Sequence, residues 1–233
     1  MTFSTEQGAA LVTGGSSGIG LAIARALRDD GYALTLAARR PEKLEAAAAE
    51  VGAHAVAANV ADEAECARVV AEHIERYGRL DVLVNSAGIG IGGNVEALTP
   101  KKLDLQLDVN LRALYLVTQA AIPHLRETKG LVVNLASIAG TLPTPGLAAY
   151  GATKAAVIAL TRSLNRELEP DGVRVTAISP GFVDTPMTTW TGLPAEEQIQ
   201  PEDIAEIVRL LLRLSPRARI PNVVVERLGE TGA

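Results

Sequence analysis

Residues 137–154, SIAGTLPTPGLAAYGATK, contain three side chains whose types and spacing suit carbonyl chemistry. Ser137 precedes Tyr150 by thirteen residues, and Lys154 follows Tyr150 by four. Residues four apart share one face of a helix, so a helix here would place the lysine ammonium beside the phenol. Ser137 follows the apolar run LVVNLA, and its hydroxyl is therefore expected at the carboxyl end of a buried strand.

A tyrosine and a lysine placed in this way make an acid–base pair. An unperturbed tyrosine titrates near pH 10, so about one molecule in 10³ is ionised at neutral pH. A neighbouring ammonium favours the phenolate and would lower the pKa of Tyr150 by roughly 1–3 units. Tyr150 would then give or take a proton at cellular pH, while Ser137 holds the same substrate oxygen. Any hydride would have to come from a bound redox cofactor.

A glycine-rich turn, TGGSSGIG at residues 13–20, lies between an apolar run and a helical pattern. Gly14, Gly18 and Gly20 let the backbone turn tightly and approach a pyrophosphate closely. The following helix would offer its free N–H groups and partial positive charge to that anion. The turn therefore predicts a nucleotide site at the first strand.

Seven short apolar runs alternate with helical patterns along the chain. The runs cover residues 9–14, 33–38, 54–60, 80–85, 131–137, 173–179 and 222–228. Runs of this length, rich in Val, Leu and Ala, are typical of strands buried on both faces. The alternation predicts an α/β fold: a Rossmann-type, doubly wound sheet of about seven parallel strands with helices on both faces. No composition break interrupts residues 1–233, which are expected to form a single domain.

Composition excludes several classes of function. The net charge of −5 argues against a nucleic-acid surface, and no apolar run approaches the length of a membrane span. Cys66 is the only cysteine, so no intrachain disulfide forms and the cytoplasm is the expected compartment. The three histidines, His54, His73 and His124, lack the spacing of metal ligands, and we expect no metal.

The TGxxxGxG turn and the Ser…YxxxK set together resemble the short-chain dehydrogenase/reductase family, in its compact single-domain branch. Three further motifs match in order: NSAG at 85–88, DVN at 108–110 and PGFVDT at 180–185. The resemblance implies that Asn110 joins Ser137, Tyr150 and Lys154 as a fourth catalytic residue, steadying a water on the proton path. It also implies that Lys154 holds the nicotinamide ribose.

The cofactor contacts implied by these motifs extend over most of the chain. We expect them at Gly14, Ser16, Ser17, Gly18, Ile19, Gly20, Arg39, Arg40, Asn59, Val60, Asn85, Ala87, Gly88, Tyr150, Lys154, Pro180, Gly181, Val183 and Thr185. Asn59 stands where the family usually has an aspartate that accepts from the adenine amine. An asparagine carbonyl is able to accept the same bond.

The end of the second apolar run, LTLAARR, predicts a preference for NADP(H), with NAD(H) possible. Relatives that bind NAD carry an acidic side chain there, which takes the ribose hydroxyls. This chain has Ala38 instead, followed by Arg39 and Arg40. A guanidinium would bind a 2′-phosphate in a bidentate manner, and Ser16 would add a hydroxyl contact. The alternative is that both arginines merely begin a solvated loop.

Loops at the strand ends should wall the substrate pocket, at residues 89–93, 138–147 and 182–193. Phe182, Met187 and Trp190 make the last of these partly apolar. We expect Ser137, Tyr150, Phe182 and Met187 to contact a small or medium carbonyl or alcohol. The resemblance also implies a homodimer or homotetramer, formed through the helix containing Asn110 and the helix after Tyr150.

Two other functions remain open at this stage. The first is another reaction class, such as a nucleotide-sugar epimerase or dehydratase, but those relatives have a different glycine spacing and a longer substrate domain. The second is a catalytically silent nucleotide-binding regulatory protein of the same fold. The intact set of Ser137, Tyr150 and Lys154 argues against it.

Overall fold

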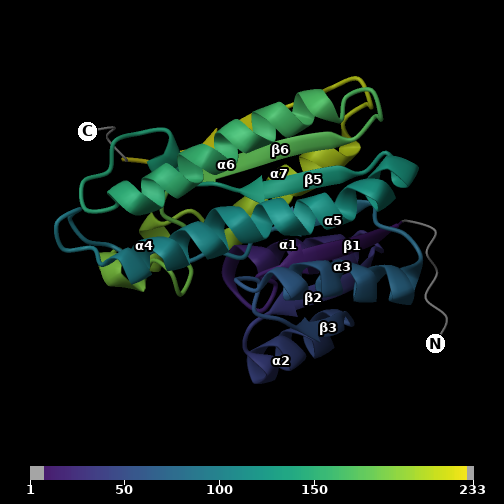
Figure 1. The fold of residues 1–233 in the computed structure, drawn as a ribbon, viewed down its shortest axis with the longest axis horizontal. Helices are drawn as coiled ribbons and strands as arrows, with labels where there is room; N and C mark the ends of the chain where they lie inside the picture. The colour runs from purple at the N-terminus through teal and green to yellow at the C-terminus, as the bar shows by residue number, and fades with distance from the viewer. Residues whose placement is uncertain (1–7, 230–233) are drawn as a thin grey trace.

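The computed structural model describes residues 8–229, and its centre is one parallel sheet of seven strands in the order β3-β2-β1-β4-β5-β6-β7 (Figure 1). The predicted doubly wound Rossmann-type sheet is confirmed. The strands are β1 (Ala9–Thr13), β2 (Ala33–Ala38), β3 (His54–Ala57), β4 (Val82–Asn85), β5 (Leu131–Leu135), β6 (Arg174–Pro180) and β7 (Asn222–Val225).

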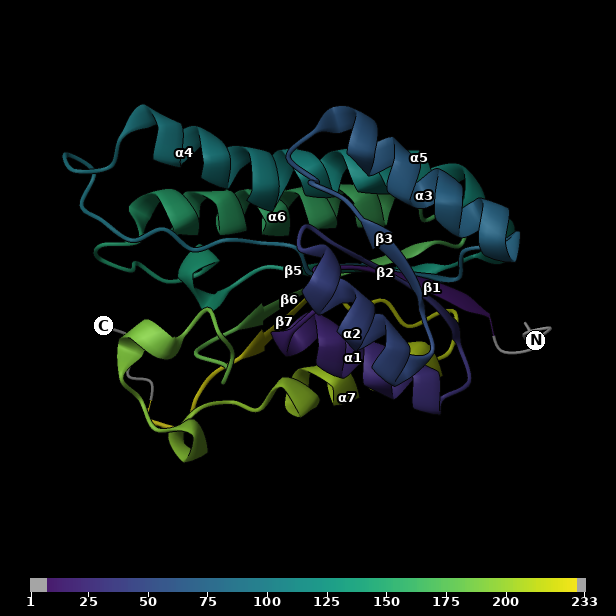
Figure 2. The same ribbon diagram turned by 90° about the horizontal axis from the view of Figure 1, so that it is seen from below.

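Helices cover both faces of the sheet. Figure 2 shows α1, α2 and α7 on one side and α3, α4, α5 and α6 on the other. Their bounds are α1 (Gly18–Asp29), α2 (Pro41–Val51), α3 (Glu63–Tyr77), α4 (Pro100–Leu107), α5 (Ala113–Thr128), α6 (Ala148–Glu167) and α7 (Pro201–Arg213). Within residues 8–229, no helix is both long enough and apolar enough to cross a membrane.

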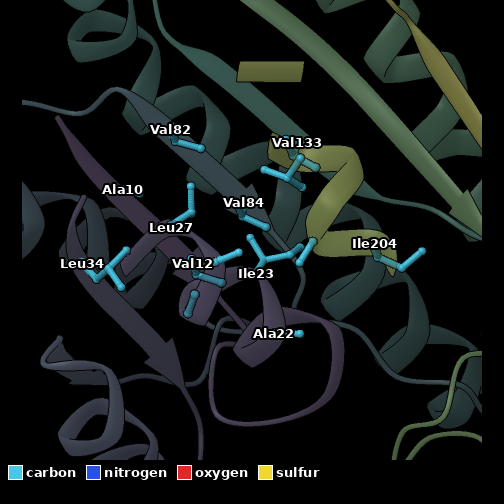
Figure 3. Packing of buried hydrophobic residues seen from close by; sticks show 14 of the residues in the cluster. Ala10, Val12, Ala22, Ile23, Leu27, Leu34, Val82, Val84, Val133 and Ile204 are labelled. Atoms are coloured by element: carbon cyan, nitrogen blue, oxygen red, sulfur yellow. The ribbon is translucent and has the colours of Figure 1, made fainter. Parts of the chain in front are cut away.

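The strands are apolar throughout because each packs a helical layer on both faces. On β1, Val12 belongs to the core beneath α1 and α7. The preceding residue, Leu11, points to the other face of the sheet and belongs to the core beneath α3 and α5. Val12, Ile23 and Ile204 are all members of the first of these cores, part of which is drawn in Figure 3. Full burial of one such aliphatic side chain stabilises the fold by about 1.5–3 kcal/mol.

The ends of the predicted elements shift where burial stops. The second predicted strand, residues 33–38, coincides with β2. The last predicted strand, residues 222–228, is shorter in the structure, because β7 ends at Val225. Leu228 is 97% exposed, and β7 is an edge strand that pairs only with β6, so nothing extends the ladder past Val225.

The strand order changes direction at β1, which pairs with β2 on one side and β4 on the other. The crossover connections leave β1 and β4 toward opposite faces of the sheet. Their carboxyl ends therefore border a crevice, which is where open α/β sheets bind ligands. The glycine turn follows β1, and the NSAG segment follows β4. The fold thus brings these two motifs to one place.

Candidate active site

The side chain of Lys154 is buried, with 5% of the residue exposed. Its Nζ donates a hydrogen bond of 2.8 Å to the carbonyl oxygen of Leu135, at the end of β5. It lies 5.7 Å from the centroid of the Tyr150 ring, so the predicted pairing on one helical face is present. Burial lowers the pKa of Lys154 to about 8.

Tyr150 lies in the first turn of α6, and its phenol is held by Ser137. Burial raises the pKa of Tyr150, and the hydrogen bond with Ser137 opposes this rise. The direction is opposite to the lowering expected from the sequence. The phenol loses water, while the Lys154 ammonium is hydrogen-bonded to Leu135.

Ser137 stands at the junction between β5 and a short 3-10 turn, η2 (Ile138–Gly140). Its Oγ accepts a hydrogen bond of 3.2 Å from the backbone N–H of Ala139, which fixes the hydroxyl oxygen at the start of the turn. The hydroxyl lies at the carboxyl end of the strand, as the sequence predicts. Ser137 and Lys154 therefore reach Tyr150 from β5 and α6, respectively.

Asn110 belongs to a five-residue π-helical turn, η1 (Asp108–Arg112), between α4 and α5. It is 1% exposed. Its Oδ1 accepts from the N–H of Ile89 at 2.8 Å, and its Nδ2 donates to the carbonyl of Ile89 at 2.9 Å and to Thr153 Oγ1 at 3.1 Å. Such π-turns are frequent at functional sites, because the extra residue redirects a side chain within a helix.

The four predicted catalytic residues converge beside the segment that follows β4. A Cβ built on Gly88 would lie 3.4 Å from Asn110 Oδ1 and 3.5 Å from Lys154 Nζ. Thr153, which sequence reasoning missed, connects this group, since its Oγ1 donates to the carbonyl of Tyr150 at 2.7 Å. Threonine on a helix gives no distinctive sequence signal, because such a bond is also made by purely structural threonines.

The glycine turn fits a pyrophosphate. Gly14 has a φ of +68°, and a Cβ there would lie 2.7 Å from the backbone nitrogen of Ala87, so only glycine allows this approach. Ser17 is the N-cap of α1 but makes no side-chain cap hydrogen bond, which leaves the first N–H groups of the helix for an anion. Thr185 borders the turn, with its Cγ2 3.0 Å from the Cβ position of Gly18.

The remaining predicted cofactor residues lie along the same crevice. Arg39 and Arg40 are exposed at the end of β2, and neither forms an ion pair with another described residue. Asn59 is exposed after β3, and Val60 and Asn85 line a small cavity of about 10 Å³ beside Ala87. Three others are half-buried: Ser16, Ile19 and Gly181. The N–H of Gly181 donates to the carbonyl of Val225 at 2.8 Å.

Two predicted cofactor residues turn their side chains into the protein. Val183 is buried in the core beneath α7. The Nδ2 of Asn85 donates to Thr118 and to Asn134 at 3.0 and 2.9 Å, and Asn134 in turn donates to Thr161 at 2.9 Å. Val183 can therefore reach a nucleotide only through its backbone, whereas Asn85 Oδ1 has no hydrogen-bond partner within residues 8–229 and lines the small cavity beside Ala87.

Phe182, Met187 and Trp190 lie in the predicted pocket loop. Phe182 and Trp190 pack edge to face with centroids 6.1 Å apart, and Trp190 is 67% exposed. A Cβ on Gly90 would lie 3.8 Å from Met187 Sδ and 3.9 Å from Tyr150 Cε2. Met187 therefore borders the same space as Tyr150.

A second depression, of about 540 Å³, lies at the opposite end of the sheet near Tyr32 and Arg209. Arg209 is paired there with Asp30 at 3.0 Å. No predicted site residue lines this depression. The chemistry is therefore assigned to the crevice at the carboxyl ends.

Comparison with known proteins agrees with this geometry. The profile of the short chain dehydrogenase family matches residues 8–193. The chain belongs to the short-chain dehydrogenase/reductase family. It is 37% identical to an uncharacterised oxidoreductase of Staphylococcus epidermidis, over 93% of this chain and 95% of the relative. It is 39% identical to the 3-oxoacyl-[acyl-carrier-protein] reductase FabG of Staphylococcus aureus, over 87% and 89% of the two chains.

Two solved structures show the same short-chain dehydrogenase/reductase architecture. An alcohol dehydrogenase of Thermococcus sibiricus, complexed with 5-hydroxy-NADP, is 33% identical, covers 97% of this chain and 98% of its own, and has a TM-score of 0.89. A 3-ketoacyl-(acyl-carrier-protein) reductase of Brucella melitensis, complexed with NADH, is 32% identical, covers 96% and 97%, and has a TM-score of 0.88. The protein is thus a nucleotide-binding oxidoreductase acting on CH–OH or C=O groups.

Burial of the Lys154 ammonium predicts a measurable cost in stability. Between pH 8 and about 10.5 the unfolded chain binds more protons at this lysine than the folded one, so folding stability rises with pH in that window. Lys154→Met removes the charge and keeps the stem. We expect it to raise the free energy of unfolding by about 1–3 kcal/mol at pH 7, and by less at pH 9.

Urea unfolding of both proteins at the two pH values measures this difference. Lys101→Met, at an exposed lysine of α4, serves as the control and should give no gain. A Lys154→Met protein less stable than wild type at pH 7 would contradict the prediction. So would a gap that stays constant from pH 7 to pH 9.

Proposed function

We propose that this protein is an NADP(H)-dependent oxidoreductase that interconverts a small or medium carbonyl compound and its alcohol, with Tyr150 as the general acid/base. One observation carries the proposal. Ser137, Asn110 and the α6 pair Tyr150 and Lys154, from three separate segments, converge beside Gly88 at the carboxyl ends of β4 and β5. That is where the family fold places its ligands.

The chain's own groups divide the work of the reaction. When bound, the nicotinamide supplies or takes the hydride at the substrate carbon. Tyr150 Oη gives its proton to the substrate oxygen in reduction, or takes it in oxidation. Ser137 holds that oxygen against the phenol through its hydroxyl. Lys154 keeps a positive charge beside the phenol and favours its ionised form as the proton leaves.

The buried polar groups support an enzyme over a silent regulatory protein. Burying an ammonium or an amide costs free energy unless the group is well paired. Lys154 and Asn110 are both almost fully buried, and burial lowers the pKa of Lys154 to about 8. Strongly perturbed groups in a cleft are typical of functional sites, and a protein that only binds a nucleotide has no need for them.

Replacement of Tyr150 by phenylalanine tests the mechanism. Tyr150→Phe removes the transferable proton and little volume, so we expect kcat to fall by at least about 100-fold. The dissociation constant for NADPH should change little, because the ring remains. Steady-state assays followed at 340 nm measure kcat, and fluorescence titration measures the dissociation constant for NADPH. Wild-type turnover in this variant would refute the role of Tyr150.

The preference for NADP(H) is proposed from Arg39. It is exposed at the end of β2 without an ion-pair partner among residues 8–229, and no carboxylate precedes it on that strand. The two ligand-bound relatives carry one cofactor of each kind, so the choice rests on this chain's own residues. A hydrogen bond to a charged group contributes roughly 1.5–3 kcal/mol, which is about 10- to 150-fold in affinity.

We therefore expect Arg39→Asp to weaken NADPH binding by about 10- to 150-fold while leaving NADH binding similar or improved. Arg162→Asp, an equal change of charge on an exposed face of α6, is the control and should not alter the ratio. Calorimetric titration with both cofactors gives the ratio. A wild-type enzyme with comparable or better kcat/KM for NADH would refute the preference without affecting Tyr150.

The substrate is proposed to be a partly hydrophobic carbonyl or alcohol, because Met187 borders the same space as Tyr150, and Phe182 packs on Trp190 in the same loop. A screen followed at 340 nm with both nicotinamides should contain free ketones, aldehydes and alcohols. It should also contain 3-oxoacyl thioesters, since one relative is named for that substrate.

We place the reaction in the cytoplasm, where the buried thiol of Cys66 stays reduced.

We also propose that the enzyme is a homodimer or homotetramer that pairs through α4, α5 and α6. Leu103, Leu107 and Tyr115 are exposed on the first two of these helices. Apolar side chains gathered on one face are typical of protein contacts. Light scattering at micromolar concentration should therefore give at least twice the chain mass of 24.3 kDa. A monomeric mass would contradict the assembly.

A further inference from the structure

Gln106 is a fully buried amide on α4, one helical turn before Asn110. Its Oε1 accepts a hydrogen bond of 3.1 Å from the backbone N–H of Ile91. Asn110 binds both backbone groups of Ile89, two residues earlier in the same segment. Two amides spaced by four residues therefore hydrogen-bond the backbone after β4 at two positions, Ile89 and Ile91.

The pattern of α4 is inverted around Gln106. Its apolar neighbours Leu105 and Leu107 are exposed, while the polar Gln106 is completely buried. Its Nε2 has no hydrogen-bond partner among residues 8–229. An unpaired buried donor costs about 1–3 kcal/mol, and an apolar side chain of the same shape would avoid that cost. The unpaired donor therefore offsets what the bond to Ile91 contributes, so glutamine brings little net stability at this position.

The segment held by Gln106 is a wall of the proposed substrate pocket. Gly90 lies between the residues bonded by the two amides, and it faces Tyr150 and Met187 within 4 Å of a built Cβ. The next residues are Gly92 and Gly93, and Gly93 donates to the carbonyl of Gly146 at 2.8 Å. Three glycines in this stretch leave the backbone little intrinsic stiffness, so its position depends on outside bonds.

We propose that Gln106 is a positioning residue that fixes residues 89–91 against Tyr150 and thereby sets the fit of the carbonyl substrate. The inference rests on the proposed function, because it assigns a role in that same pocket. Within residues 8–229, the Gln106 side chain makes its only hydrogen bond to Ile91. It acts through the N–H of Ile91, whereas Asn110 reaches both the loop and the catalytic helix.

Gln106→Met tests this role, because it keeps the length of the side chain and removes the acceptor. Loss of one neutral hydrogen bond corresponds to a KM for the carbonyl substrate about 3- to 10-fold higher. The kcat at saturation and the dissociation constant for NADPH should stay within about twofold of wild type. The melting temperature should change little, since the variant leaves the Ile91 N–H without its acceptor but also removes the unpaired Nε2 donor.

Two matched variants separate positioning from general damage to α4. Gln106→Glu keeps an acceptor for Ile91 and should restore a KM near the wild-type value at pH 6, where a buried carboxyl is neutral. Leu105→Met changes the exposed neighbour and should leave every quantity unchanged. A wild-type KM in Gln106→Met would overturn the proposal. So would a joint fall of kcat, cofactor affinity and melting temperature.

Amide hydrogen exchange of the wild-type protein gives a test independent of any variant. The N–H of Ile91 should be protected, while the N–H of Gly92 exchanges rapidly. A freely exchanging Ile91 amide in a catalytically active protein would refute the positioning role of Gln106 and leave the proposed function intact. A protected Ile91 in a protein that turns over no carbonyl or alcohol would refute the function instead.

Discussion

The buried ammonium of Lys154 is the constraint on which the rest of the site depends. It must approach the Leu135 carbonyl to 2.8 Å, which requires α6 to lie very close to the turn after β5. Two glycines make that approach sterically possible. A Cβ on Gly140 would lie 2.7 Å from the α6 backbone, and one on Gly151 would lie 2.6 Å from the Ala139 carbonyl oxygen. The same close packing brings Tyr150 within reach of Ser137, so one contact between helix and turn positions all three groups.

A buried line of polar side chains supports this contact from inside the protein. Thr118 of α5, Asn85 of β4, Asn134 of β5 and Thr161 of α6 are hydrogen-bonded in succession. All four are at most 3% exposed. Such a network is stable only if the two strands keep their register and both helices keep their position along the sheet. It therefore links the end of β4, where the glycine turn docks, to the end of β5, where Ser137 begins its turn.

The sequence predicts the parts of this protein that depend on local pattern. Apolar runs predict the seven strands, and β2 matches its run at both ends, because strand burial is uniform there. The Ser137, Tyr150 and Lys154 spacing likewise predicts that they meet. Their pKa values are harder to predict from the sequence, because the pKa of Tyr150 depends on how much water the fold removes from the phenol. Gln106 gives no signal in the sequence, since its role depends on a backbone N–H that only the folded chain brings near.

The two halves of the crevice are built by different means. The nucleotide half relies on backbone: Gly14 makes room for the turn, and the start of α1 supplies N–H groups that no side chain caps. The catalytic half relies on buried side chains, each needing partners to offset the loss of water. Backbone sites depend on conformation and tolerate many side chains nearby, whereas a buried polar cluster depends on each member. Asn85 joins the two halves, because it stands in a cofactor motif while its Nδ2 donates to Thr118 and Asn134 in the support of the catalytic half.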